Sequence, residues 1–138
     1  MNIEICLEYL EFSDWLFIEK MLKTEKKFDL EERTLLFAKR IIIFCKNLPN
    51  NTINFKLIDQ LIRSAGSIGA NYREANDSLG KKDFIHRLRI ARKESKETIF
   101  WLELIKEANK NILINDLIDE CSQLRNILSA IIKKVENK

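Results

Sequence analysis

The sequence predicts an all-α protein, an antiparallel up-down four-helix bundle with an additional, partly helical N-terminal extension. Only 3 Gly and 1 Pro occur in 138 residues, which leaves little material for the tight turns of a β fold. Hydrophobic residues make up 46% of the chain and charged residues 33%, as in a globular domain with long solvated helices. Apolar residues recur at helical spacing in four successive segments, and the short breaks between them force neighbouring helices to run antiparallel.

Two parts are expected along the chain. Residues 1–28 form the extension, and their apolar side chains fit one or two helical pieces. Residues 29–138 form the four-helix bundle domain. The stretch from Met1 to Thr34 carries nine acidic and five basic residues, so the extension is acidic and could dock a basic partner.

The first two bundle helices have clear start and stop signals. Asp29, followed by Glu32 three residues later, forms an Asp variant of the capping box and predicts a helix start. Pro49 ends this helix, because the residue before a proline avoids the α region. The second helix is predicted to begin near residues 52–54 and to end within residues 77–80.

The second predicted helix is unusual in its middle, where residues 64–70 are nearly all small. Gly66 and Gly69 each cost about 1 kcal/mol relative to alanine inside a helix. Close approach of another backbone is the usual structural compensation. This helix is therefore expected to cross a neighbouring helix, or a second subunit, at short range.

The third helix, predicted over residues 81–109, carries a strong excess of positive charge. Residues 81–96 contain seven basic and two acidic side chains. Acidic partners one turn away are scarce, whereas a plain solvated helix has many. The stretch is a candidate nucleic-acid-binding surface, with an ordinary solvated face as the alternative. The candidate residues are Lys81, Lys82, Arg87, Arg89, Arg92, Lys93 and Lys96.

The fourth helix follows a short turn at residues 109–111. Its apolar residues, from Ile114 to Val135, have the most regular helical spacing in the chain. A helix of this kind covers the remaining side of a bundle core.

Nothing in the sequence indicates catalysis or metal binding. His86 is the only histidine, and one His with three scattered cysteines builds no standard zinc site. The wide spacing of Cys6, Cys45 and Cys121 predicts buried thiols in a reducing compartment. No signal peptide or membrane-spanning run is recognisable. We therefore expect a cytoplasmic protein with no enzyme activity, no cofactor, no metal and no membrane partner.

A further set of residues is assigned to structure or to an interface. Asn71 and Glu74 are polar positions on an otherwise packed helix, and an internal network, for example between Glu74 and Arg63, is one interpretation. Contact with a ligand or RNA is the alternative. Trp101 could stack on a base, but its place beside an apolar stripe favours core or subunit packing. The full set is Arg63, Ser67, Gly69, Asn71, Glu74 and Trp101.

Several segments resemble a known family, the four-helix bundle proteins encoded in intervening sequences of bacterial large-subunit ribosomal RNA genes. The most specific are SIGANYREA at residues 67–75 and KKDF at residues 81–84. The resemblance extends over about residues 28–135. The remaining segments that carry it are residues 29–34, 37–40, 58–64, 90–91, 93–98 and 101–105.

The resemblance implies an up-down bundle that assembles as a ring-like homo-oligomer, typically a pentamer, without enzyme activity or cofactor. A related branch includes the accessory variability determinant of diversity-generating retroelements, which binds nucleic acid and a reverse transcriptase. The N-terminal extension departs from the usual pattern of the family. Two functions stay open: an oligomer that binds structured RNA or DNA through the third helix, or a protein-protein scaffold or accessory subunit.

Overall fold

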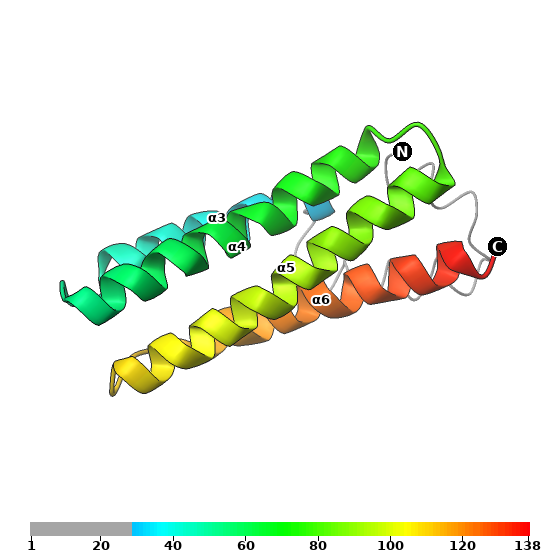
Figure 1. Ribbon diagram of the computed structural model, residues 1–138. Helices are drawn as coiled ribbons and strands as arrows, with labels where there is room; N and C mark the ends of the chain where they lie inside the picture. The colour runs from blue at the N-terminus through cyan, green and yellow to red at the C-terminus, as the bar shows by residue number, and fades with distance from the viewer. Residues whose placement is uncertain (1–28) are drawn as a thin grey trace.

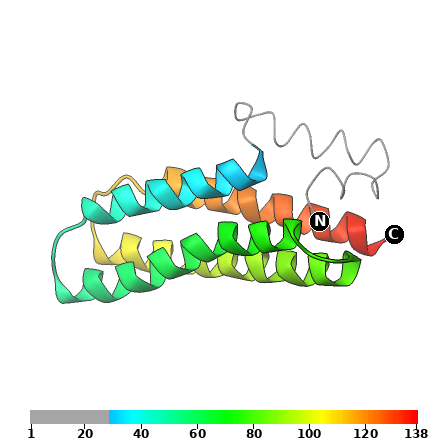
Figure 2. The ribbon, with the colours of Figure 1, turned by 90° about the horizontal axis from the view of Figure 1, so that it is seen from above.

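The computed structural model describes residues 29–138 as four helices: α3 (Leu30–Lys46), α4 (Thr52–Asn76), α5 (Lys81–Ala108) and α6 (Asn115–Glu136). Successive helices run antiparallel along one long bundle (Figures 1 and 2). The predicted all-α, up-down four-helix bundle is confirmed. The extension predicted over residues 1–28 lies outside the described residues.

The first two helices start at local side-chain caps. The Asp29 carboxylate accepts a hydrogen bond from the Glu32 backbone N–H at 2.7 Å, which confirms the predicted capping signal. The Asn51 side chain does the same for the Asn54 N–H at 2.8 Å. Pro49 lies between the two helices, as predicted. Asn111 adopts a positive φ of 62° in the α5–α6 connection, a conformation that Asn tolerates better than most residues.

The core is a continuous apolar layer to which all four helices contribute. The α4–α5 contact is the most extensive, followed by α5–α6 and α3–α4, while α3 touches α6 and closes the bundle. Cys45 and Cys121 are both buried in this core, so the prediction that they act as small apolar side chains is confirmed. Cys6 lies outside the described residues. None of the four described helices is long and apolar enough to cross a membrane.

The two glycines of α4 have different surroundings. A Cβ at Gly69 would lie 2.9 Å from the Thr34 hydroxyl oxygen and 3.2 Å from its Cβ, so α3 crosses α4 closely at this point. At Gly66, nothing within the described part of the chain comes within 4 Å of a Cβ. The predicted close crossing of a neighbouring helix is confirmed at Gly69, and the alternative of a second subunit close to Gly66 stays a prediction.

Buried polar groups join helices that are distant in sequence. Arg33 of α3 donates to the Glu120 carboxylate of α6 from Nη2 at 2.6 Å and from Nε at 3.1 Å. Both side chains are nearly inaccessible, with 3% and 9% exposed. The same Nη2 donates to the Gln123 side-chain oxygen at 2.8 Å. This ion pair fixes the register of α3 against α6.

A second buried polar contact holds the α3–α4 loop against the end of α5. The side-chain amides of Asn54 and Asn109 donate to each other at 2.9 and 2.8 Å. Their remaining N–H groups donate to the carbonyls of Pro49 and Ile105, each at 2.9 Å. Because these donors are satisfied, the pair stabilises the end of the bundle instead of marking a ligand site.

Candidate nucleic-acid interface

Four basic side chains share one exposed face of α5. Lys82, Arg89, Lys93 and Lys96 follow one another at steps of seven, four and three residues, and all four are exposed. Steps of three, four and seven keep side chains on the same side of a helix. At about 1.5 Å per residue, the face extends over roughly 21 Å.

The other three predicted cations are less exposed than these four. Lys81, Arg87 and Arg92 are half-buried. Arg87 lies eleven residues, about three turns, before Thr98, whose hydroxyl donates to Ser64 of α4 at 3.0 Å. Arg87 is therefore directed towards α4. Four of the seven predicted residues are exposed on one side of α5, and the assignment of the set to nucleic-acid binding stays a prediction.

Two contacts place α6 alongside the basic face of α5. The Cys121 thiol donates to the Ser95 carbonyl at 3.3 Å. Nearer the end of the bundle, Glu136 pairs with Arg89. The C-terminal part of α6, from Cys121 onward, therefore packs along the N-terminal half of α5.

Arg125 and Lys133 of α6 add positive charge to this surface. Arg125 lies eleven residues before Glu136, and Lys133 lies three residues before it, so both are near the side of α6 that meets Arg89. Neither residue was among the predicted cations, because nothing in the sequence relates positions of α6 to the basic side of α5. Their only sequence signal is this spacing to Glu136, which has meaning once the Arg89 contact is known. The α5–α6 basic face is defined from here on as Lys82, Arg89, Lys93, Lys96, Arg125 and Lys133.

Among the described residues, Glu136 is the acidic residue that forms a salt bridge with this face. Within residues 29–138, Lys82, Lys93 and Lys96 form no salt bridge. Of the four exposed α5 cations, Arg89 is the one with a salt bridge in this range. Glu94 is half-buried, and its pKa is raised by burial and by Glu97, while Lys93 acts in the opposite direction. Three lysines therefore present uncompensated positive charge to solvent.

The polar residues predicted on α4 lie along its outer surface. The Arg63 guanidinium pairs with Asp59 at 3.3 Å, and Glu74 is exposed, so the suggested internal pair between Glu74 and Arg63 is wrong. Ser67 donates to the Arg63 carbonyl and Asn71 to the Ser67 carbonyl, each at 2.8 Å and one turn back. These bonds stay within one helix, because the side chains point away from the core. Their assignment to an interface stays a prediction.

Apolar side chains form a second surface on the opposite part of the bundle. Glu31 of α3 contacts Asn76 of α4, and Gly69 of α4 abuts Thr34 of α3, so these residues mark where the two helices meet. Exposed apolar residues lie at helical spacing along α3 and along α4, next to this contact between the two helices. They are Leu35 (42% exposed), Ile42 (43%), Phe55 (73%) and Ile62 (40%), and together they are called the α3–α4 apolar seam.

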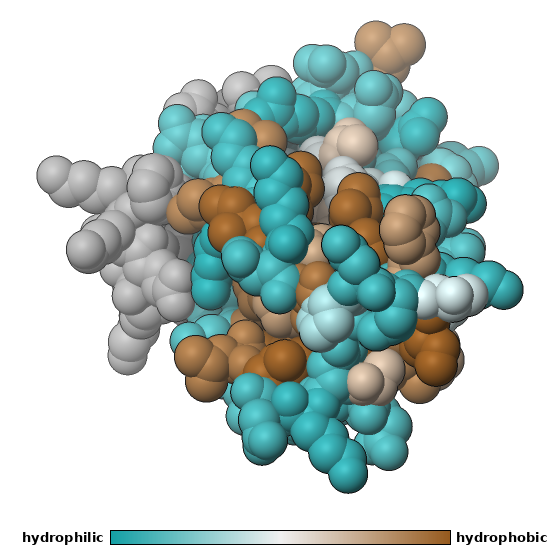
Figure 3. Space-filling model, turned by 90° about the vertical axis from the view of Figure 1, so that its left-hand side faces the viewer, coloured by the Kyte–Doolittle hydropathy of each residue, from teal (hydrophilic) through white to brown (hydrophobic). Residues whose placement is uncertain are grey.

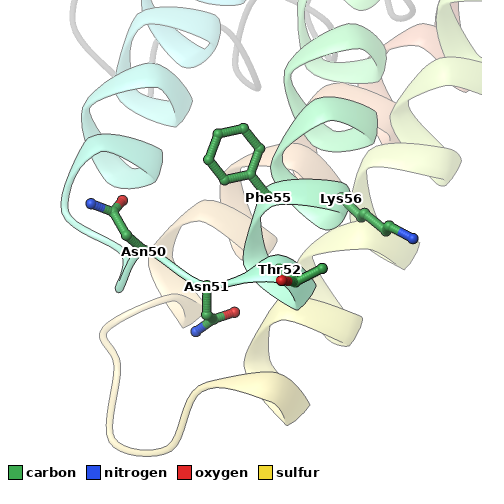
Figure 4. Close-up of a pocket in the computed structure, with 5 residues that line it drawn as sticks. All are labelled: Asn50, Asn51, Thr52, Phe55 and Lys56. Atoms are coloured by element: carbon green, nitrogen blue, oxygen red, sulfur yellow. The ribbon is translucent and has the colours of Figure 1, made fainter.

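One end of this seam is hollowed. A depression of about 470 Å³ is lined by Phe55, Lys56, Ile58, Asp59 and Ile62. Phe55 projects from α4 towards the side of α3, while Lys56 points away from it (Figure 4). Apolar groups also interrupt the hydrophilic surface at the end of the bundle that carries the α3–α4 and α5–α6 connections (Figure 3). Grouped exposed apolar side chains of this kind mark candidate protein-interaction sites.

The buried thiols and the possible metal ligands among the described residues form no reactive or metal-binding site. Burial raises the pKa of the Cys45 thiol to about 11. Burial also raises the pKa of the Cys121 thiol to about 12, with smaller effects of Arg125, which lowers it, and Glu120, which raises it. Both thiols therefore stay protonated at neutral pH, and a thiol is not the nucleophilic form. Among residues 29–138, His, Cys, Asp and Glu do not gather in threes as metal ligands.

Comparison with known proteins identifies the family. The model of the 23S rRNA-intervening sequence protein family matches residues 18–130. The chain belongs to this family. A solved structure from Bacteroides thetaiotaomicron VPI-5482, described as a protein with unknown function from the S23 ribosomal protein family, is 37% identical. The similarity covers 75% of this chain and 94% of that chain, with a TM-score of 0.68. No functionally curated protein matches.

Proposed function

We propose that this intervening-sequence protein is a non-enzymatic homo-oligomer that binds RNA or DNA through the α5–α6 basic face. The observation that carries the proposal is the exposure of Lys82, Lys93 and Lys96 on one side of α5 without acidic partners among the described residues. Phosphate groups are the ligands that such a linear set of cations attracts most strongly. The proposal includes no cofactor and a cytoplasmic location.

Assembly would strengthen this binding. We infer a ring-like homo-oligomer, with five subunits as the family resemblance suggests, held together through apolar surface such as the α3–α4 seam. A ring repeats the basic face once per subunit. Several weak contacts on one nucleic acid then act together, so the measured affinity exceeds that of a single face.

Charge reversal tests the nucleic-acid site. Lys82→Glu, Lys93→Glu and Lys96→Glu together should weaken binding to a structured RNA by at least about 100-fold at low salt, because three phosphate contacts become repulsive. Wild-type affinity should fall with rising salt, with a logarithmic slope of about −0.7 to −0.9 per phosphate contact. Fluorescence anisotropy over a salt series measures both.

A matched control distinguishes the effect of the proposed site on binding from the effect of the change in net charge. Lys39, Lys46 and Lys110 are three exposed lysines on α3 and in the α5–α6 connection, away from the basic face. Their change to Glu alters the net charge by the same amount and should leave most of the affinity intact. Equal losses in the two triple variants, or undetectable RNA binding by the wild type at low salt, would refute the proposed site.

The apolar seam gives a second prediction. Phe55→Ser with Ile62→Ser should reduce the oligomer to smaller species, because buried aromatic and aliphatic anchors carry most of the energy of an interface. Light-scattering mass after size exclusion is the measurement. Ile53→Ser, which is 64% exposed on the other side of α4, is the control and should leave the mass unchanged. An unchanged mass in the double variant would exclude the seam as the subunit contact.

A protein scaffold or accessory subunit, for example of a reverse transcriptase, is the alternative function. The observation in its favour is the same exposed seam, since apolar patches mark protein-interaction sites. The two functions give different results. A scaffold would keep a defined mass, ignore RNA at low salt and recover a protein partner that the Phe55→Ser and Ile62→Ser variant fails to recover.

A further inference from the structure

The α5–α6 basic face ends at an exposed aromatic ring. Phe100 lies seven residues after Lys93 and four after Lys96, on the same side of α5, and 55% of it is exposed. An exposed phenyl ring beside lysines combines a flat apolar face with positive charge. It is a favourable surface for a group that is flat, apolar on its faces and attached to a negative charge.

The neighbouring residues hold this ring in place. Phe100 and Trp101 form an edge-to-face pair, with ring centroids 5.1 Å apart and planes at 71°. Trp101 is half-buried and donates from its indole nitrogen to Glu97 at 3.3 Å. The partly buried indole therefore restricts Phe100 without covering it.

The charges along α5 orient a ligand that reaches this ring. Lys93 and Lys96 precede Phe100 by about 10 and 6 Å along the helix axis. Glu103 and Glu107 follow it by three and seven residues and are exposed. A bound phosphate chain is therefore attracted on the lysine side of Phe100 and repelled beyond it.

We propose that Phe100 is a stacking platform for an unpaired base, so that the ligand of the basic face is a nucleic acid with single-stranded nucleotides. The inference rests on the proposed function, because the lysines bind the phosphates that deliver the base. A duplex presents paired bases that cannot stack on a side chain, whereas an unpaired base offers its whole face. Duplex contacts would use the lysines alone.

The test compares two labelled probes on the full chain by fluorescence anisotropy at low salt. They are a uridine oligonucleotide of about 20 nucleotides and a blunt RNA duplex of the same length. Phe100→Ala should weaken binding of the single strand by about 5- to 100-fold and leave duplex binding unchanged. Phe100→Trp should retain the affinity, because it keeps an aromatic face. Leu104→Ala is the control, since it removes a partly exposed apolar side chain from the same helix.

The outcomes separate the two proposals. If the wild type binds neither probe, the nucleic-acid function and the stacking platform both fail. If it binds both but Phe100→Ala weakens neither, or weakens both equally, only the platform fails. A change in light-scattering mass in Phe100→Ala, or an equal loss in Leu104→Ala, would assign the ring to a protein contact and overturn the platform.

Discussion

Arg33→Met is expected to lower the free energy of unfolding by about 3–5 kcal/mol. The substitution leaves the Glu120 carboxylate buried against α3 without its cation, and only 9% of that side chain is exposed. Removing one member of a buried ion pair leaves an uncompensated charge, which is among the most destabilising single changes. Chemical denaturation at a fixed protein concentration measures the loss.

Two controls identify the cause of that loss. Combining Arg33→Met with Glu120→Leu removes both charges and should restore most of the stability, because apolar replacements for a buried pair are often neutral or stabilising. Arg63→Ala removes an exposed salt bridge to Asp59 and should cost at most about 1 kcal/mol. Equal destabilisation by the single and double variants would show that packing, and not charge, decides the effect.

Gly69→Leu is expected to destabilise the bundle by about 2–3 kcal/mol, or to prevent its folding. Even a Cβ at this position would lie 2.9 Å from the Thr34 hydroxyl oxygen, so the larger side chain forces α3 and α4 apart. The gain in helix propensity over glycine, about 0.8–1 kcal/mol, is too small to compensate. Thermal and chemical unfolding, followed by circular dichroism, measure the change.

Gly66 provides the matched comparison on the same helix. It is exposed, and within residues 29–138 nothing approaches its Cβ position within 4 Å. Gly66→Leu should therefore leave stability unchanged or raise it by up to about 1 kcal/mol. If the two leucine variants behave alike, the close crossing at Gly69 has no energetic importance.

The helices themselves were predictable because their signals are local. The Asp29 cap, the Pro49 stop and the apolar spacing of α6 act within a few residues, and the structure confirms each. The exposed α5 cations were predictable for the same reason, because Lys82, Arg89, Lys93 and Lys96 repeat at helical intervals. Periodicity within one helix says which side chains share a face.

Contacts between helices were not predictable in this way. Arg33 and Glu120 are 87 residues apart, and no local pattern connects them. An internal pair of Glu74 with Arg63 was one interpretation, because Glu74 lies in a packed segment, but its place on the helix turns it to the surface. Whether a side chain is buried depends on which side of its helix the neighbouring helices cover.

The sequence alone determined the helical class, the boundaries of the four helices and the concentration of positive charge on α5, because these follow from local capping and spacing. The tertiary structure decided which residues act together. Packing of α6 against α5 added Arg125 and Lys133 to the basic face and neutralised Arg89 with Glu136. It also left Phe100 exposed at the end of that face. Such outcomes depend on the rotation and register of one helix against another, which only the packed core sets.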